Sequence, residues 1–556
     1  MEGRQAVCTE NEQRKTRRAL QVLAKIDRSN EHKTMIKKIL GLILIFLAFL
    51  LLIGIFISPS IRWKIIYIFI IVICWVAGAM LIITKEGKPS ALWRWTKISL
   101  IAAAIIYSAF ILFTNYIAPI LPHKVNSSIS IIVVPEAPFV DEQMRIIISG
   151  LEPYLPITVK AIMKDGRGEL WASQAEFKSD ENGTADLATQ KPISGTYEDA
   201  DPMGIIWSME PVDKKTASIY KNDTIKPEDL KIIVEIYGNE VAVKKINRVY
   251  MAPGVKRIPI SEGGLYGVLF KPAGKGQHPG ILILSGSDGG IREDYASLLA
   301  SRGYNAFALG YFGWPGLPKE LAQVRLEYIE KAVKWFKGNP SVSKKGIGII
   351  GRSKGGELSL LSASTFKDIK AVAAYVGSGV VWQSPSRVNM NTPVSSWTYR
   401  GKDIPFVPTK ASPLYIAKYM LAKATGKPIG TKPMYTEGLK DLSAVKKAVI
   451  KVENINGPVL LISAMDDAIW PSTKLSQMAI DRMKKFNHPF SHEHIAYSGC
   501  GHSISLPYQP TTVTYSYNPS AGFKLEHGGT PKAEAAARED SWKSILRFFR
   551  ENLDNK

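Results

Sequence analysis

The sequence predicts a multi-domain chain: three transmembrane helices, then an antiparallel β-sandwich, then a mostly parallel sheet with helices on both faces. Three patterns support this prediction: three uncharged apolar runs, a stretch of short β-branched and aromatic runs, and strand–helix alternation over about the last 300 of 556 residues. The expected boundaries are a basic leader at 1–38, a three-helix anchor at 39–118, the sandwich at 129–252, and the α/β domain at 253–556 with a lid insertion at about 380–450.

The apolar runs at 39–57, 65–83 and 98–117 carry no charge, and each is long enough to cross about 30 Å of hydrocarbon. A cleaved signal peptide does not fit, because the first run starts late and two more follow. Lys and Arg gather before the first run and between the second and third, which predicts a cytoplasmic N-terminus and an extracytoplasmic C-terminal domain. A cytoplasmic C-terminal domain is the alternative. These runs predict a multi-pass membrane protein with the lipid bilayer as a partner.

The charge of the chain is +22, from 71 Lys and Arg against 49 Asp and Glu. Such a charge suits nucleic acid or an anionic surface. Residues 1–128 hold 17 Lys and Arg against 6 Asp and Glu, and the remainder lacks basic stretches interleaved with aromatics, which excludes nucleic acid as a partner. The three cysteines, Cys8, Cys74 and Cys500, lie in separate regions, so neither a disulfide framework nor a metal site is predicted. No cofactor and no oligomeric state are predicted.

The sandwich is predicted from runs such as "ISIIVVPEAPFV", "PITVKAIM" and "KIIVEIYG", which are rich in Val, Ile and aromatics and separated by turn residues. We interpret this domain as an accessory module that shapes or shields a neighbouring site. The following domain alternates strand-like runs, such as "GILILSG" and "PVLLISA", with amphipathic helices. That alternation is typical of a parallel sheet covered on both faces.

The stretch "GIGIIGRSKGGELSL" places Ser353 in the pattern Gly-X-Ser-X-Gly, between a predicted strand and a predicted helix. The pattern alone also fits a glycine-rich turn with a serine helix cap. A strand before the serine, a helix after it, and glycines at 351, 355 and 356 together favour a nucleophile elbow. We therefore predict that Ser353 is a catalytic nucleophile.

A nucleophilic serine needs a histidine base, and that histidine needs an orienting carboxylate; on such an elbow they follow in the order Ser, Asp or Glu, His. "PVLLISAMDDAIWP" ends in two aspartates, and we predict Asp467 rather than Asp466 because Pro471 follows four residues later. A solvated turn is the alternative. "HEHIAYSGCGHS" ends in His502, the predicted base, for which a plain loop histidine is the alternative. Two further histidines are interpreted as surface or packing residues: His492 and His494.

An oxyanion hole is the remaining requirement of acyl chemistry. One donor is predicted to be the backbone N–H of Lys354, and the second the amide of Ser287 or Asp288 in "LILSGSDGGI". Gly286 and Gly289 shape that turn. An ordinary strand–helix turn, or a helix cap at Asp288, is the alternative.

Both C-terminal domains resemble the acyl-CoA thioesterase and bile acid-CoA:amino acid N-acyltransferase family over about residues 129–556. In the sandwich the similar stretches are "LWASQAEFKSDENGTADLA" and "SGTYEDADPMGIIWSMEP". In the second domain they are "GSDGGIREDYASLLASRGYNAFALGYFGWPGLPKE", "GIIGRSKGGELSL", "SSWTYRGKDIP", "DDAIWPS" and "GCGHSISLPY".

This resemblance implies an immunoglobulin-like domain packed on an α/β-hydrolase, with Ser353, Asp467 and His502 as the triad. It also implies carboxylic thioesters, typically acyl-CoA, as substrates. Members that conjugate amino acids carry cysteine as the nucleophile, so the serine here favours hydrolysis. Cys500 is interpreted as a packing residue.

The lid insertion is rich in aromatic side chains, and Trp397 and Tyr399 are predicted to bind the acyl substrate. The alternative is that the lid aromatics form the lid's own small core. That set also includes Trp382, Tyr415 and Tyr419.

Together these features predict a membrane-anchored serine hydrolase that cleaves acyl thioesters through a Ser-His-Asp triad and an acyl-enzyme intermediate. Three alternatives remain open at this point. They are a carboxylesterase or peptidase acting on an extracytoplasmic substrate, an acyltransferase to an amine acceptor, and a non-catalytic surface binding protein.

Overall fold

The computed structural model describes residues 129–553 apart from 216, 223, 386–391 and 519–522, together with 35, 36, 39, 40, 43 and 108. The chain divides into two compact units, Met1–Val125 and Asn126–Lys556.

In the part of the chain that the structure describes, each helix is too short or too polar to span a bilayer. This finding contradicts the predicted localisation as a multi-pass membrane protein with an extracytoplasmic catalytic domain, and a bilayer anchor is likewise unsupported. That prediction depended on the hydropathy of 39–57, 65–83 and 98–117, which, apart from isolated positions, lie outside the described residues.

Two antiparallel sheets form the predicted sandwich. One has the strand order β1-β2-β5, and the other β6-β4-β3-β8-β9 with β7 beside β4. Every second residue of β3 is buried, as sheet geometry requires when one face covers a core. Side chains from both sheets, including Ile146 and Ile232, meet in one apolar cluster. The bounds are β1 Ser130–Val134, β2 Arg145–Ser149, β3 Pro156–Lys164, β4 Leu170–Lys178, β5 Ala185–Asp186, β6 Ser194–Gly195, α4 Gly204–Trp207, β7 Glu210–Pro211, β8 Glu228–Ile236 and β9 Asn239–Arg248.

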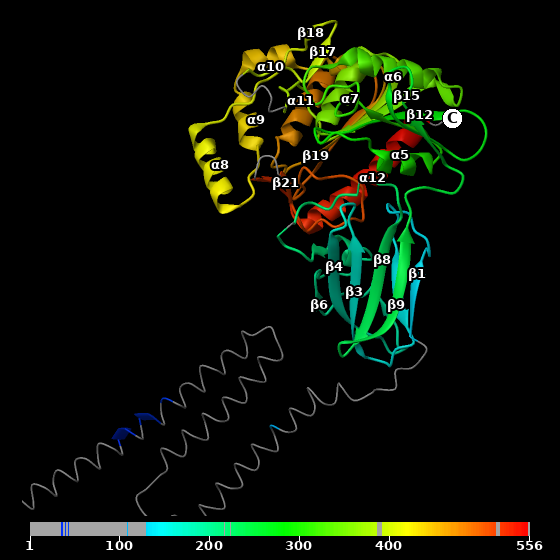
Figure 1. The fold of residues 1–556 in the computed structure, drawn as a ribbon, viewed down its shortest axis with the longest axis vertical. Helices are drawn as coiled ribbons and strands as arrows, with labels where there is room; N and C mark the ends of the chain where they lie inside the picture. The colour runs from blue at the N-terminus through cyan, green and yellow to red at the C-terminus, as the bar shows by residue number, and fades with distance from the viewer. Residues whose placement is uncertain are drawn as a thin grey trace, which may run out of the picture. The chain divides into compact units, whose positions relative to one another are not determined.

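The second domain is built on one long sheet with the strand order β10-β11-β13-β12-β15-β16-β19-β20 (Figure 1). Strands β10 and β11 are antiparallel to their neighbours, and the others run parallel. Such a sheet confirms the predicted α/β domain. The bounds are β10 Lys256–Ile260, β11 Tyr266–Lys271, β12 His278–Leu284, β13 Asn305–Gly310, β15 Val342–Arg352, β16 Ile369–Tyr375, β19 Val459–Ala464 and β20 His492–Tyr497.

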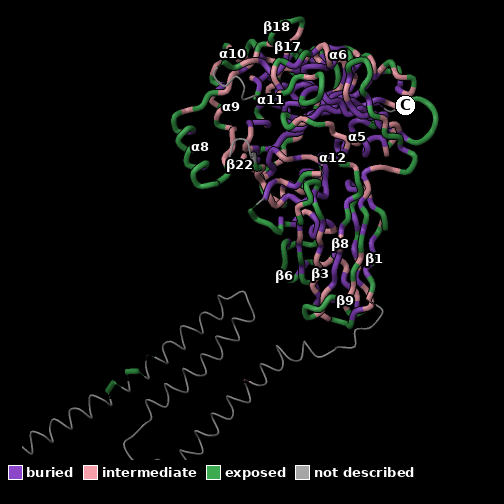
Figure 2. Tube along the Cα trace, viewed as in Figure 1, coloured by how far each residue is buried: buried purple, intermediate pink, exposed green. Residues whose placement is uncertain are grey.

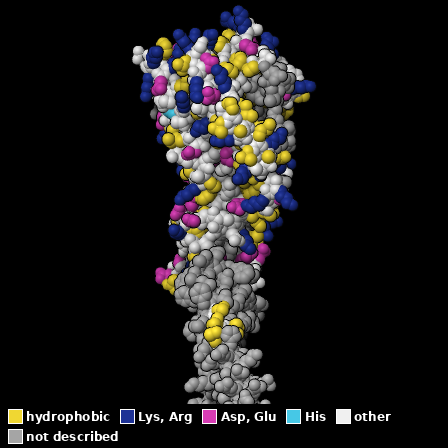
Figure 3. All heavy atoms as spheres, turned by 90° about the vertical axis from the view of Figure 1, so that its left-hand side faces the viewer, with side chains coloured by type: hydrophobic (Ala, Val, Ile, Leu, Met, Phe, Trp, Pro, Cys, Tyr) yellow, Lys and Arg dark blue, Asp and Glu magenta, His cyan; other side chains and the backbone are white. Residues whose placement is uncertain are grey.

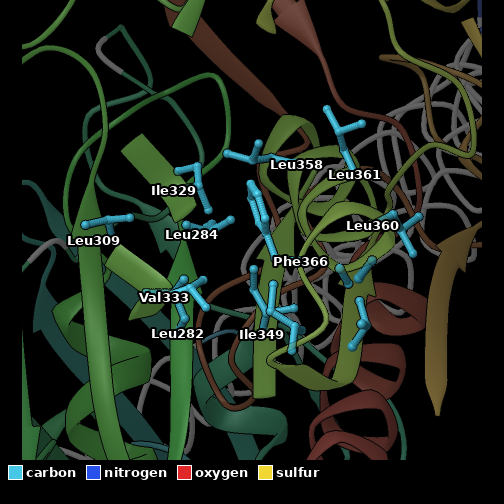
Figure 4. Packing of buried hydrophobic residues seen from close by; sticks show 14 of the residues in the cluster. Leu282, Leu284, Leu309, Ile329, Val333, Ile349, Leu358, Leu360, Leu361 and Phe366 are labelled. Carbon is cyan, nitrogen blue, oxygen red and sulfur yellow. The ribbon is translucent and has the colours of Figure 1, made fainter. Parts of the chain in front are cut away.

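Helices cover both faces of this sheet, which explains why every residue of β13 and of β19 is buried (Figure 2). On one face α6, α7 and α11 pack on alternate strand residues, and Figure 4 shows Leu282, Ile349 and Leu358 within this layer. On the other face α5 and α12 contribute side chains such as Leu298 and Phe549. The bounds are α5 Glu293–Ala300, α6 Leu326–Gly338, α7 Lys354–Thr365, α11 Ser472–Lys485 and α12 Pro531–Leu553.

The segment between β16 and β19 holds the elements of the predicted lid. They are β17 Trp397–Tyr399, β18 Lys402–Asp403, α8 Pro413–Thr425, α9 Lys432–Gly438, α10 Leu442–Ala448 and η2 Val452–Asn454. Strand β17 pairs with β14 (Val324–Arg325), which ties the lid to the segment before α6. A hairpin follows β20, formed by β21 (Tyr515–Asn518) and β22 (Phe523–Glu526).

Buried polar contacts hold the sandwich against the α/β domain. The guanidinium of Arg248 is fully buried, and it donates to Glu228 Oε2 at 3.0 Å and to the carbonyl of Tyr508 at 2.8 Å. Asp141 accepts from the indole of Trp542 at 2.6 Å. A buried charge without such partners would be strongly destabilising, so these contacts specify one docking geometry.

Candidate active site

Ser353 lies at the junction of β15 and α7 with φ 57° and ψ −121°. A non-glycine residue at positive φ is sterically unfavourable, and here the surrounding backbone enforces it. The amide of Ser353 donates to the carbonyl of Tyr375 at 2.8 Å. A Cβ placed on Gly355 would lie 2.2 Å from the carbonyl oxygen of Ser285, so the turn requires glycine there. This is the geometry expected of a nucleophile elbow.

The structure brings Ser353, His502 and Asp467 together from three loops at the carboxyl end of the sheet. His502 Nε2 lies 2.9 Å from Ser353 Oγ, and His502 Nδ1 lies 2.8 Å from Asp467 Oδ2. A carboxylate at Nδ1 fixes that nitrogen as the proton donor, so Nε2 is left to accept the serine proton. All three side chains are buried.

The two aspartates of the acid loop have different environments. Asp467 is buried, and its Oδ1 accepts from the amides of Ile469 at 2.8 Å and Trp470 at 3.1 Å. Asp466 is exposed, and its Oδ2 accepts from the amide of Gly499 at 2.7 Å. Only Asp467 therefore reaches the imidazole while its second oxygen is held by the backbone.

The predicted oxyanion loop follows β12 and lies against the elbow. A Cβ placed on Gly286 would lie 3.5 Å from the Cβ of Ser353, and the amide of Gly289 closes the turn onto the carbonyl of Gly286 at 3.1 Å. Ser287 and Asp288 are exposed at the tip of this turn. This position beside Ser353 is compatible with the predicted role of the Ser287 or Asp288 amide as the second donor of the oxyanion hole.

The side chain of Asp288 faces the cation that precedes the nucleophile. Its Oδ2 lies 3.6 Å from Arg352 Nη2. Partial desolvation at this turn works to raise the pKa of the exposed Asp288 carboxyl, but the positive charges of Arg352 and Arg292 outweigh it and hold the pKa below its usual range. Arg352 also donates to the carbonyl of His502 at 3.2 Å. No sequence pattern pointed to Arg352, which links the predicted oxyanion loop to the predicted base.

The side chain of Lys354 has surroundings that the sequence did not predict. Its Nζ lies 2.7 Å from Glu357 Oε1 and 3.2 Å from the carbonyl of Trp382, and both charged groups are buried. The indole of Trp397 donates to the same Glu357 oxygen at 2.7 Å. Burial lowers the pKa of Lys354 and raises that of Glu357, while their mutual attraction opposes both shifts. This network connects the predicted oxyanion amide to the lid.

The structure does not bring the two predicted substrate-binding aromatics to the serine. Trp397 is fully buried, and its indole is used in the bond to Glu357. Tyr399 packs edge-on against Phe366, which follows the last turn of α7, the far end from Ser353. Trp382 packs with Trp470 and Tyr435 in a separate apolar cluster. These contacts fit the alternative, a lid core.

His527 is a second histidine at this site that the sequence analysis missed. Its ring lies 6.1 Å from that of His502, and the hydroxyls of Ser503 and Ser516 lie 2.8 Å from its two nitrogens. Its carbonyl accepts from the amide of His502 at 2.9 Å and from that of Ala468 at 3.1 Å. Burial, reinforced by the neighbouring His502, lowers the pKa of His527 to about 3. The backbone of His527 therefore joins the acid loop to the base loop.

Cys500 is fully buried, and its Sγ lies 3.1 Å from Glu534 Oε2. Burial and this carboxylate raise the pKa of the thiol well above its usual value, which suppresses the thiolate. The packing role predicted for Cys500 fits these surroundings. Across the described residues, no group of three or more His, Cys, Asp or Glu side chains is placed to hold a metal ion.

Two family models match the chain. "Acyl-CoA thioester hydrolase/BAAT N-terminal region" matches residues 141–262, and "BAAT / Acyl-CoA thioester hydrolase C terminal" matches residues 324–555. Acyl-coenzyme A thioesterase 6 of Mus musculus is 32% identical, over 75% of this chain and 94% of its own. Mitochondrial acyl-coenzyme A thioesterase 2 of Rattus norvegicus is also 32% identical, over 75% and 87%. Acyl-coenzyme A amino acid N-acyltransferase 1 of Mus musculus is 32% identical over 76% and 98%. These matches confirm the resemblance found in the sequence.

Solved structures are similar at a lower level. A dienelactone hydrolase from Klebsiella pneumoniae is 17% identical with a TM-score of 0.31, over 53% of this chain and 98% of its own. An acylaminoacyl peptidase is 14% identical with a TM-score of 0.35, over 76% and 61%. The strand order of the long sheet and the turn at Ser353 define the fold of the second domain.

Proposed function

Since this chain belongs to the acyl-CoA thioester hydrolase/BAAT family, we propose that it hydrolyses acyl thioesters, with acyl-CoA as the substrate class, through an acyl-enzyme on Ser353. The observation that carries the proposal is the continuous hydrogen-bonded chain from Asp467 through His502 to the Ser353 hydroxyl. In this arrangement an alcohol becomes a nucleophile because a base stands at hydrogen-bond distance and is itself oriented.

Acylation begins when Ser353 Oγ attacks the thioester carbonyl carbon and His502 Nε2 takes the hydroxyl proton. The imidazolium that forms is stabilised by Asp467, which stays ionised. The carbonyl oxygen becomes an oxyanion, which the amide of Lys354 and an amide of Ser287 or Asp288 stabilise. Collapse of the intermediate breaks the C–S bond, and the proton on His502 passes to the departing thiolate.

Deacylation repeats these steps with a new nucleophile. Water gives its proton to His502 and attacks the acyl-enzyme, and the returning proton restores the Ser353 hydroxyl as the acid leaves. An amino acid amine in place of water would give an amide, the second candidate function. The observation that favours this candidate is the similarity to an amino acid N-acyltransferase. We place hydrolysis first because the nucleophile at the elbow is serine. The nearby cysteine, Cys500, is buried and hydrogen-bonded to Glu534, so it does not offer an alternative nucleophile.

The proposal is tested with the purified full-length chain and acyl-CoA of several chain lengths, by measuring release of the free thiol. Simple esters and short peptides serve as competing substrate classes, and glycine is added in a parallel series with product masses recorded. We expect thiol release with free acid as the product, and a fall of at least about 10³-fold in kcat for Ser353→Ala. A preference for esters or peptides would replace the thioesterase proposal, and an acylglycine product would make transfer the main reaction.

A fluorophosphonate probe separates a lost active site from a lost fold. It should label wild-type protein at Ser353 and leave Ser353→Ala unlabelled. Ser364→Ala is the matched control, because this serine lies on the same helix α7 and its hydroxyl bonds only the local carbonyl of Leu361. Wild-type protein that is folded but resists the probe would instead support a non-catalytic binding protein.

A further inference from the structure

Helix α8 exposes large apolar side chains on its outer side. Leu414 is 66% exposed, Met420 61%, Leu421 65% and Ile416 50%. At about 100° per residue these side chains, with two alanines between them, form one continuous arc of about 160°. Figure 3 turns toward the viewer the side on which α8 lies in Figure 1, and it shows hydrophobic side chains gathered among Lys and Arg. Contiguous exposed apolar surface of this kind marks an interaction site.

The segment that carries the arc is basic in sequence, and one of its lysines, Lys410, lies 3.2 Å from Asp441. Residues 404–436 contain five lysines and no aspartate or glutamate. On α8 itself, Lys418 and Lys423 lie at the two flanks of the apolar arc, and both are exposed. The other lysines of the segment are Lys410, Lys427 and Lys432.

The helix is preformed, so the arc is a stable feature of the surface. Ser412 caps its N-terminus, with the hydroxyl accepting from the amide of Tyr415 at 3.2 Å, and Pro413 occupies the first turn. Gly426 ends it with φ 67°, the left-handed conformation that favours glycine. The inner side is anchored separately, because Tyr415 is buried and Tyr419 packs edge-on against Phe523. The outer residues are therefore not needed to hold α8 in place.

We propose that α8 is a peripheral docking helix for an anionic lipid surface. An apolar arc flanked by lysines is the pattern of helices that lie in the plane of a lipid interface, with apolar side chains below the headgroups and cations among them. The positive charges of Lys418 and Lys423 favour an anionic lipid surface over the other segments that could cover the arc. A second copy of α8 would bring like charges together, and the basic leader at 1–38 would do the same. Phosphate and carboxylate headgroups above acyl chains match both the charge and the apolar arc.

The β21–β22 hairpin connects the segment after α8 to the loop of the proposed catalytic base, His502. After α8 the chain pairs with β22, since the amide of Ile429 donates to the carbonyl of Lys524 at 3.0 Å and the amide of Glu526 donates to that of Ile429 at 3.1 Å. Strand β22 leads directly into His527, whose carbonyl holds the amide of His502. A lipid surface at α8 therefore lies near the site where acyl chains would be processed.

The experiment uses a fluorophore whose emission depends on polarity, attached at Met420→Cys in the full-length chain with Cys8→Ser and Cys74→Ser. Cys500 is buried and stays. The probe reports the polarity around α8, so a shift requires that α8 itself moves out of water. We expect a blue shift with phosphatidylcholine vesicles that contain phosphatidylserine, reversed by high salt. Lys418→Glu/Lys423→Glu should weaken the vesicle affinity reported by the probe at least about tenfold, because each lysine near an anionic surface contributes about fivefold.

Two controls make the result specific. A probe at Val212→Cys, an exposed apolar position of the sandwich, should show no shift, and Lys244→Glu/Lys245→Glu on β9 should leave the α8 signal unchanged. Circular dichroism and hydrolysis of a water-soluble short-chain thioester check that the variants stay folded. No shift at position 420, or an equal shift with phosphatidylcholine alone, would overturn the proposal. A shift that grows with protein concentration without vesicles would replace the lipid by a second copy.

Discussion

Helices α7 and α8 are similar in length, with 12 and 13 residues, but they relate to solvent in opposite ways. Ten residues of α7 are buried, including the charged Lys354 and Glu357, whereas only Tyr415 and Ala422 are buried on α8. Burying charges and exposing large apolar side chains are both unfavourable for folding. The buried charges of α7 lie next to the proposed nucleophile, and the exposed apolar side chains of α8 form the proposed docking surface.

Different interactions stabilise the buried charges of α7 and the exposed apolar arc of α8. On α7 the charges are tolerated because they are paired and hydrogen-bonded to the lid through Trp382 and Trp397. On α8 the apolar arc is tolerated because caps and an anchored inner face keep the helix formed. Changes to the buried residues of α7 should therefore cost activity or stability, while changes on the outer side of α8 should cost neither.

The largest effect is expected at the acid of the proposed triad. Asp467→Asn retains the shape of the side chain but removes the charge that orients and stabilises the imidazolium, so kcat for thioester hydrolysis should fall by about 10⁴. Lys418→Gln on α8 is the matched comparison, and it should hydrolyse a water-soluble thioester at the wild-type rate. If Asp467→Asn retained nearly full activity, Asp466 or another carboxylate would have to be the acid.

The next effect concerns the buried pair at the start of α7. Lys354→Met should lower the free energy of unfolding by about 3–5 kcal/mol, because Glu357 then stays buried without its countercharge. The double variant Lys354→Met/Glu357→Leu should recover most of that loss, since no lone charge remains. Urea unfolding of the wild type, Lys354→Met, Glu357→Leu and the double variant gives the coupling free energy between the two side chains. Additive losses in the double variant would contradict the pairing.

Much of the site could be predicted because its residues lie at strand ends in a fixed chain order. A parallel sheet collects the carboxyl ends of its strands at one edge, so the loops that carry Ser353, Asp467 and His502 were expected to meet. The structure places these side chains within hydrogen-bond distance of each other. Their catalytic roles stay proposals until activity is measured.

The remaining features depend on contacts between segments far apart in the chain. Trp397 was predicted to line the substrate site, but it lies in the buried network with Glu357, 40 positions earlier. His527 lies in a loop after a hairpin, where no spacing rule connects it to His502. The exposed arc of α8 was missed because an apolar run in a lid looks the same whether it packs inward or faces solvent.

Per pH unit, a smaller effect is expected from the titration of His527. Its folded pKa of about 3 lies below the usual value of 6.5, so the unfolded chain binds the extra proton first as the pH falls. Stability is then lost between about pH 6.5 and pH 3, by up to about 1.4 kcal/mol per pH unit. His527→Gln removes this titration while offering one donor and one acceptor to Ser503 and Ser516. Its unfolding free energy should fall less steeply over this range than that of the wild type, and an equal slope would show that His527 is not responsible.

The smallest effect is expected on the outer side of α8. Met420→Ser/Leu421→Ser should change the free energy of unfolding by no more than about 0.5 kcal/mol per site, because these side chains already face water in the folded chain. Leu358→Ala on α7 is the matched comparison, and it should cost about 2–5 kcal/mol because Leu358 is fully buried in the same apolar cluster as Phe366 and Ile329 (Figure 4). Urea unfolding without lipid measures both. A large loss from the α8 variant would mean that its apolar arc packs against another part of this chain, and the arc would then not be available to dock.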